Sequence, residues 1–206
     1  MNRYKELIKA LALAVVITAG AGACKTSGDK TPEHDSGTHS HESRVDQTPT
    51  GSVGRVSEDD AWTFATVPLP QKGNPPRFVS NPDGVISKET EDELNKLLLY
   101  AKVDLGIESC VVVVNHVDNS DVESFAYALF DNFEDNNNMM VIVMSYEDRG
   151  VRMELGRELE SKLSEIQCQQ ALDNILIPYL REDKPDEGLI ALVEGLYDRM
   201  SKNKTK

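Results

Sequence analysis

MMVIVMSYEDRGVRMEL, residues 139–155, is the stretch that decides the fold. Its first part, MMVIVM (139–144), is a continuous apolar run, which is typical of a strand covered on both faces of a sheet. EDRG (147–150) then turns the chain, and apolar and polar residues alternate in VRMEL (151–155). This alternation predicts a half-exposed edge strand, and the short turn requires it to run antiparallel to the strand before it.

The chain upstream of this stretch alternates between strand and helix patterns. CVVVVNHV (110–117) is a second buried strand, and Phe78-Val79 begins a short first one. Apolar residues recur at helical spacing in the two intervals between these strands, with Ser87 and Asp121 or Ser120 as helix starts and Gly106 as a helix end. Such alternation implies right-handed crossovers and parallel pairing of the first three strands.

Two further helical patterns follow the edge strand, one over about 165–180 and one that begins at Pro185. We therefore predict an α/β fold: a three-layer α/β/α sandwich with a mostly parallel sheet of about four strands and an antiparallel edge strand. The domain is expected to span residues 77–206.

The N-terminal part has the features of an export signal. MNRYKELIK is basic, and the apolar stretch after it ends in small residues at Ala21-Gly22-Ala23-Cys24. This segment is too short to span a bilayer and fits a cleaved signal peptide over residues 1–24. Because its end resembles the bacterial lipobox, Cys24 is expected to be lipidated and to anchor the chain to a bacterial membrane. The expected location is the cell envelope, on the periplasmic or surface side.

Residues 25–76 are rich in polar residues, glycine and proline, which predicts a flexible tether. AWTFATVPLP (61–70) is an apolar island within it, expected either to dock onto the domain or to bind a partner. Three histidines at 34, 39 and 41 can be read as a weak zinc or copper site or as an incidental polar tract; the composition favours the polar tract.

Charge and cysteines restrict the function classes. The net charge is −13, from 35 acidic and 22 basic residues. Nucleic acid is therefore not an expected partner, because phosphate backbones require clustered Lys and Arg. Cys110 and Cys168 either form one disulfide or are separate buried thiols.

Acidic residues follow several of the expected strands. Ligands in open parallel sheets bind beyond the carboxyl ends of the strands, and these ends carry Asp83, Asp118, Glu147 and Asp148. Oxygen ligands of this kind suit a divalent cation, with calcium as the first expectation. Each aspartate can equally be a turn former or a helix cap. DNFEDNNN (131–138) is also acidic but lies at the opposite ends of the strands.

The standard catalytic motifs for nucleotide, zinc-protease and serine-hydrolase chemistry are absent. The order of the remaining features resembles the TPM domain family over residues 78–200. The matching pieces are PDGVIS, ESCVVVVNHV, YALFDNF, NNMMVIVMSYEDRGVRMELG, ILIPYL and EDKPDEGL.

The resemblance implies an α/β/α sandwich, calcium binding in an acidic pocket and a proposed acid phosphatase activity. The aspartate that the family has before its first helix falls on Asp83, and its acidic pair before arginine falls on Glu147 and Asp148. One departure is the loop before the third strand, where the family usually has Trp-Gly-Ile-Gly and this chain has DNFEDNNN.

Two functions are expected from these observations. The preferred one is a non-catalytic, metal-stabilised binding module that assists the assembly or repair of envelope complexes, with an envelope protein as its partner. The alternative is a metal-dependent phosphatase acting on small phosphomonoesters, with Asp148 and Arg149 as catalytic candidates because hydrolysis needs a nucleophile and a cationic clamp.

Overall fold

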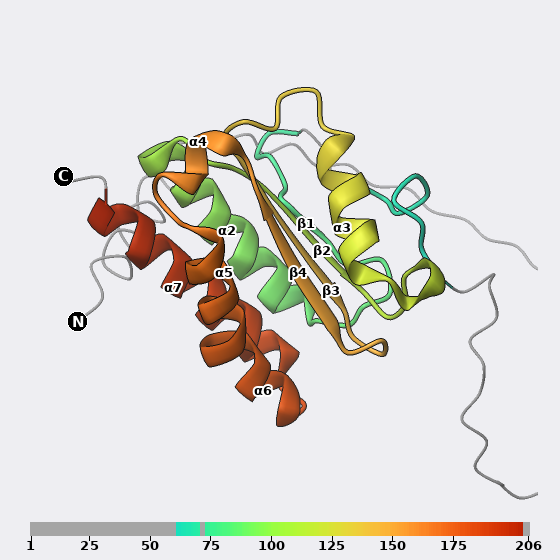
Figure 1. The fold of residues 1–206 in the computed structure, drawn as a ribbon. Helices are drawn as coiled ribbons and strands as arrows, with labels where there is room; N and C mark the ends of the chain where they lie inside the picture. Colours follow the sequence, from blue (N-terminus) through green and yellow to red (C-terminus); the bar gives the residue numbers. More distant parts are fainter. Residues whose placement is uncertain (1–60, 71–72, 204–206) are drawn as a thin grey trace, which may run out of the picture. The chain divides into compact units, whose positions relative to one another are not determined.

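The structure, a computed structural model, describes residues 61–70 and 73–203. A four-stranded sheet has the order β1-β2-β3-β4, formed by β1 (Val79–Ser80), β2 (Glu108–Val114), β3 (Met139–Ser145) and β4 (Gly150–Leu155) (Figure 1). The first three strands are parallel, and β4 is antiparallel to β3. The predicted α/β fold with an antiparallel edge strand is confirmed.

The two central strands are buried as their apolar runs predict. All seven residues of β3 are buried, and in β2 only Glu108 is exposed. Residues of β4 are mostly half-buried, with Met153 as its buried member. Burial of a Val, Ile or Met side chain contributes roughly 1.5–3 kcal/mol each, so these strands dominate the stability of the sheet.

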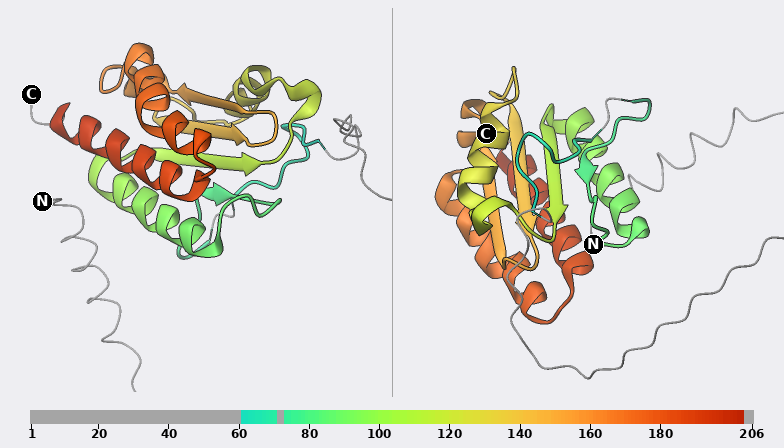
Figure 2. Two further views of the ribbon diagram at one scale, coloured as in Figure 1. Left: turned by 90° about the horizontal axis from the view of Figure 1, so that it is seen from below. Right: turned by 90° about the vertical axis from the view of Figure 1, so that its right-hand side faces the viewer.

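Helices cover both faces of the sheet (Figures 1 and 2). α3 (Val122–Asp131) lies on one face, against β3 and β4. α2 (Lys88–Leu105), α5 (Glu165–Ala171) and α7 (Pro185–Asn203) lie on the other. The short α4 (Arg157–Glu160) follows the edge strand.

The predicted helix boundaries are largely those of the structure. The Ser87 hydroxyl caps α2 by accepting from the Thr90 amide, and Gly106 ends α2 in a left-handed conformation. The Asp121 carboxylate caps α3 by accepting from the Ser124 amide. A 3-10 turn over Asp118–Ser120 comes directly before it.

The helix expected over 165–180 is interrupted by a π-helix at Leu172–Leu176, between α5 and α6 (Ile177–Arg181). The Ile177 amide donates to the Leu172 carbonyl, five residues back. Pro178 gives the physical reason, because it lacks an N–H and its ring collides with a carbonyl four residues earlier. The wider turn relieves that collision without ending the helix.

The apolar island docks onto the domain. Trp62 forms a parallel bridge with Val117, and its amide donates to the His116 carbonyl (3.0 Å). Val67 is buried in the core between β2 and α3. This segment therefore supplies apolar side chains that pack against the domain.

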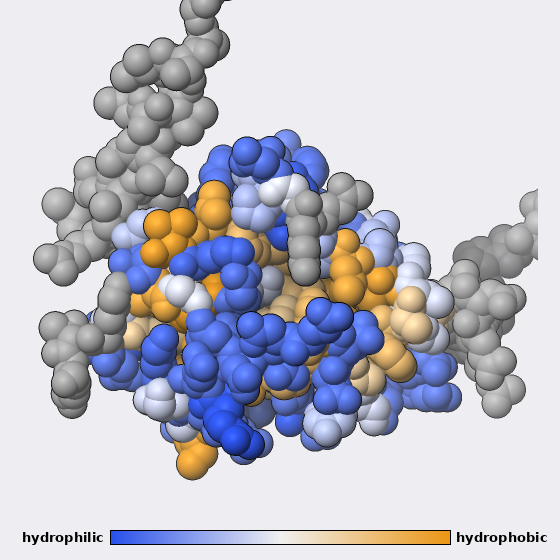
Figure 3. All heavy atoms as spheres, turned by 90° about the horizontal axis from the view of Figure 1, so that it is seen from above, coloured by the Kyte–Doolittle hydropathy of each residue, from blue (hydrophilic) through white to orange (hydrophobic). Residues whose placement is uncertain are grey.

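The edge at the start of β3 is closed by a backbone contact. A Cβ atom on Gly156 would lie 2.0 Å from the Asn136 carbonyl oxygen, so only glycine allows the chain to pass this loop. The acidic residues Asp131, Glu134 and Asp135 of the loop are exposed. On the face seen from above in Figure 3, hydrophilic residues cover much of the surface and hydrophobic patches lie between them.

Cys110 and Cys168 are buried free thiols, so the disulfide alternative does not hold. None of the helices described has both the length and the apolar character needed to cross a membrane. The predicted signal peptide, Cys24 and most of the predicted tether, including its histidines, lie outside the described residues.

Candidate functional site

The carboxyl ends of β1, β2 and β3 meet at one edge, as the parallel pairing requires. Asp83 follows β1, Asp118 follows β2, and Glu147 and Asp148 follow β3. The structure thus brings all four predicted residues to one edge of the sheet. They differ greatly in what their carboxylates contact.

Asp148 is almost fully buried, with 4% of its side chain exposed. Its Oδ1 accepts from the Ser120 hydroxyl (2.8 Å) and lies 3.0 Å from His116 Nδ1. Its Oδ2 accepts from the Val117 amide (2.9 Å) and from the Ser145 hydroxyl. Both oxygens are therefore occupied by donors of the surrounding chain, and Asp148 joins the ends of β2 and β3.

The environment of Asp148 keeps it ionised. Burial by itself raises the pKa of this carboxyl, but hydrogen bonds from His116, Ser145, the Val117 amide and Ser120 outweigh it and lower the pKa to about 2. A carboxylate held this way is a poor proton donor near neutral pH. It is also a poor nucleophile, since its lone pairs are already engaged.

Asp83 has a similar structural role at the end of β1. It accepts from the indole nitrogen of Trp62 at both oxygens (3.0 and 3.1 Å) and from the Asn115 amide (2.7 Å). Asp83 thereby fastens the docked segment to the end of β2. This structural role accounts for an aspartate directly before Gly84 just as fully as metal binding would.

Asp118 and Glu147 are the two remaining carboxylates. Both are exposed, and neither side chain has a hydrogen-bond or ion-pair partner among residues 61–70 and 73–203. Across the same residues, no group of three or more His, Cys, Asp or Glu side chains is placed to hold a metal ion. The expected four-carboxylate cation site therefore fits poorly in this conformation.

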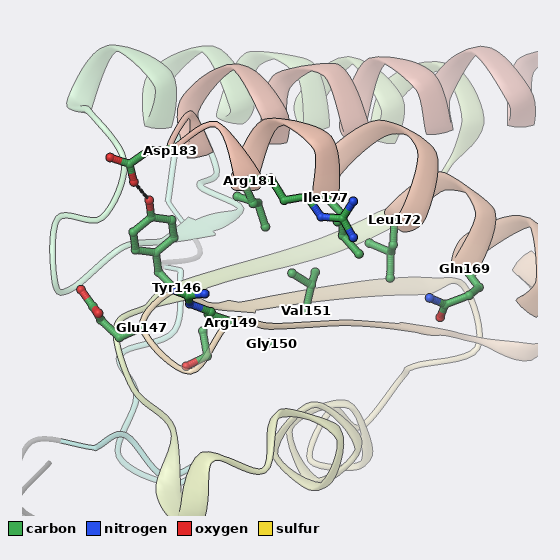
Figure 4. Close-up of a pocket in the computed structure, with 12 residues that line it drawn as sticks. Tyr146, Glu147, Arg149, Gly150, Val151, Gln169, Leu172, Ile177, Arg181 and Asp183 are labelled. Carbon is green, nitrogen blue, oxygen red and sulfur yellow. Dashed lines mark hydrogen bonds between the residues drawn. The ribbon is translucent and has the colours of Figure 1, made fainter. Parts of the chain in front are cut away.

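An open pocket of about 960 Å³ lies beside this edge, between the β3–β4 turn and helices α5 and α6 (Figure 4). Its polar side chains include Arg149, Arg181 and Gln169, and its apolar surface includes Val151, Leu172 and Ile177. Tyr146 and Asp183 close one end, where the tyrosine hydroxyl donates to the Asp183 carboxylate and its pKa is thereby raised.

Backbone conformations with positive φ gather at the same edge. Within the described ranges, the non-glycine residues with positive φ are Asn119, Ser120, Arg149 and Asp183. Ser120 binds Asp148, and Arg149 and Asp183 line the pocket. Such residues cost free energy unless their surroundings hold them, and they occur preferentially at functional sites.

The sequence alone did not indicate Tyr146, Gln169, Arg181 or Asp183. Arg181 is the last residue of α6, and Asp183 follows it by two residues. Neither residue directly follows a strand, so the pattern of strand ends did not point to them. The π-helix at Leu172–Leu176 sets their position over the pocket. Pro178, which lies just after this π-helix, was the only local sign in the sequence that the helix would be distorted.

Comparison with known proteins agrees with the topology. Residues 79–199 match the TPM domain family, whose profile also carries the name TPM phosphatase. A search of curated proteins finds no match.

Two solved structures from bacteria are similar. The N-terminal domain of a protein from P. gingivalis has 25% identity and a TM-score of 0.64, covering 69% of this chain and 93% of that one. The N-terminal domain of the cg2496 protein from Corynebacterium glutamicum has 16% identity and a TM-score of 0.51, covering 59% and 78%. The second shows similarity of fold alone.

Proposed function

Because the chain belongs to the TPM domain family, we propose that it is an envelope lipoprotein whose domain is a non-catalytic binding module. The observation that carries this proposal is the contrast between the pocket and Asp148. The pocket is open and contains two arginines beside Glu147 and Asp183, whereas the catalytic candidate Asp148 is buried and bound on both oxygens. This arrangement favours holding a ligand over attacking one.

A phosphatase is the alternative function. It would need a free nucleophile or an activated water next to a cationic clamp. Arg149 can supply the clamp, but Asp148 has no free oxygen for attack. No group of three or more metal-ligating side chains lies in residues 61–70 and 73–203. The site thus supplies a clamp, whereas Asp148 is not placed to supply the nucleophile.

The activity test compares the full chain with two variants on a generic phosphomonoester. We expect kcat/KM far below about 10⁴ M⁻¹s⁻¹, the lower end for ordinary enzymes. Arg149→Asn should leave the residual rate unchanged, since asparagine tolerates the positive φ and removes only the charge. A higher value that falls about a hundredfold in both Arg149→Asn and Asp148→Asn would contradict the binding-module proposal.

Membrane attachment is the second part of the proposal. Lipidation of Cys24 would place the domain at a bacterial membrane through the segment 25–60. We expect Cys24→Ala to release the chain from membranes, as measured by fractionation after a high-salt wash. Cys110→Ala is the matched control and should leave fractionation unchanged; retention of Cys24→Ala in the membrane pellet would contradict the proposed anchor.

Cation binding is the third part of the proposal, and the hydrogen bonds of the four carboxylates decide which of them can bind a cation. Asp118 and Glu147 have free carboxylates, whereas Asp83 and Asp148 would have to give up their present donors. We propose that a divalent cation such as calcium binds weakly at Asp118 and Glu147, completed by backbone carbonyls and water.

A further inference from the structure

β4 is the last strand of the sheet, and no strand pairs with its outer edge within residues 61–70 and 73–203. The Gly156 amide donates to the Met139 carbonyl (2.8 Å). This bond shows which residues of β4 are hydrogen-bonded to β3 and which are not. Because bonded and non-bonded pairs alternate in an antiparallel ladder, Val151, Met153 and Leu155 direct their N–H and C=O groups away from β3. β4 therefore presents a row of backbone donors and acceptors.

A groove follows this row. The large pocket is lined by Gly150 and Val151, and a second pocket of about 230 Å³ is lined by Arg152 and Met153. Both pockets share Gln169 and Leu172 on the helical side. The two pockets are therefore neighbours along β4, with α5 beside both and α6 beside the larger one, and we call them together the β4 groove.

The groove has the shape of a strand-binding site. α5 lies beside β4 and beyond the end of the sheet (Figure 2), so the helices overhang the free edge. In Figure 4, Leu172 and Ile177 descend from the helices toward Val151 on the strand. A single extended chain can pair with β4 below this overhang and place alternate side chains against these apolar groups.

One end of the groove holds two arginines together with the carboxylates of Glu147 and Asp183. Arg149 precedes β4, and Arg181 ends α6 above it. Neither guanidinium has a hydrogen-bond or ion-pair partner in the described part of the chain, although the protein carries a net charge of −13. Of the acidic groups here, Asp183 is bound by Tyr146, and Glu147 is exposed and screened by solvent.

We propose that the β4 groove binds an extended peptide of a partner protein as an added strand, with a carboxylate of the peptide held between Arg149 and Arg181. The carboxylate lies at the amino end of β4, so the peptide runs antiparallel to β4 when that carboxylate is near its carboxyl terminus. This inference rests on the binding-module proposal and names its partner: an alternating apolar segment with a terminal or near-terminal acidic group.

A second copy of the chain fits this edge less well. In an antiparallel β4–β4 dimer, α5 and α6 of the two copies would lie on the same side of the joined sheet and compete for the space beside the two paired strands. A small free anion would satisfy the arginines but leave the outward amides of Val151 and Met153 without partners. An extended peptide satisfies both sets of groups.

The test uses the full chain in detergent and a fluorescent peptide of alternating valine and threonine with a free carboxyl terminus. Two further peptides have an amidated terminus, one of them with aspartate near that end. We expect saturable binding of the free-acid peptide and slowed hydrogen exchange at Val151 and Met153. Equal binding of the amidated aspartate peptide would assign the carboxylate to a side chain; its failure to bind would assign it to a chain terminus.

Three variants separate the contributions. Val151→Pro removes an outward N–H without removing a bond to β3, because that group faces away from the ladder. We expect it to abolish binding. Arg149→Asn with Arg181→Gln should weaken binding at least about tenfold, since charge-assisted bonds are lost. Arg157→Gln, at an exposed position of α4, is the control for charge and should bind as wild type does.

Absence of saturable binding, or binding that is unchanged in both Val151→Pro and the double arginine variant, would overturn the peptide assignment. Because Arg149→Asn and Arg181→Gln alter exposed side chains, they test it even if Val151→Pro does not fold. Phosphomonoester turnover is measured on the same samples. If turnover stays at background and no peptide binds, only the proposal of a peptide-binding groove is wrong. If turnover is rapid and depends on Arg149, the proposal of a non-catalytic binding module is wrong as well.

Discussion

The two edges of the sheet are both acidic in sequence, yet the structure uses their acidic residues differently. At the carboxyl edge, Asp83 and Asp148 are hydrogen-bonded to backbone and side chains of other strands. At the other edge, the acidic residues of the 131–138 loop are exposed. This loop is held close to the end of β4 by backbone packing against Gly156 and not by its carboxylates. Local acidity therefore does not distinguish a structural or functional carboxylate from a solvated one; strand polarity and burial do.

The largest expected difference between the two edges is in stability. Asp148→Ala should lower the free energy of unfolding by about 3 kcal/mol, because it leaves the Val117 amide and other buried donors without an acceptor. Asp135→Ala, in the loop at the other edge, should change it by less than about 0.5 kcal/mol. Urea unfolding of both variants measures this, and equal losses would remove the distinction between the edges.

The same comparison has a pH dependence. The pKa of Asp148 is lowered to about 2 in the folded protein, below its ordinary unfolded value of about 3.9. Its contribution to stability is complete above that unfolded pKa and is lost as pH falls from about 4 to 2. Wild type should therefore lose stability over this window more steeply than Asp148→Asn does. Parallel curves would show that the hydrogen bonds to Asp148 do not favour its charged form.

The smallest expected effect is that of calcium. Weak binding at several times the Kd stabilises a fold by about 1 kcal/mol, or a few degrees in Tm. We expect this increment to disappear in Asp118→Asn and Glu147→Gln but to persist in Asp135→Asn. A loss of the increment in Asp135→Asn alone would move the cation to the opposite edge. Thermal unfolding with calcium or with a chelator measures the increment for each variant.

Part of this protein could be predicted from its sequence because it depends on local patterns. Apolar runs such as 139–144 are typical of strands covered on both faces of a sheet, and the short EDRG turn requires an antiparallel return. The order of strands and helices then limits the topology, and parallel pairing places Asp83, Asp118, Glu147 and Asp148 at one edge. The helix caps at Ser87 and Asp121 follow from the same local chemistry.

The tertiary structure alone decided what those residues do. Whether a carboxylate is free depends on donors that come from other strands, and for Asp148 they include His116 and Ser120, distant in sequence. Likewise, Arg149 and Arg181 share a pocket because the π-helix and the overhang of α5 and α6 place them there. The sequence determined the elements and their order through local periodicity; burial, partners and the groove depend on contacts between distant segments, which periodicity does not encode.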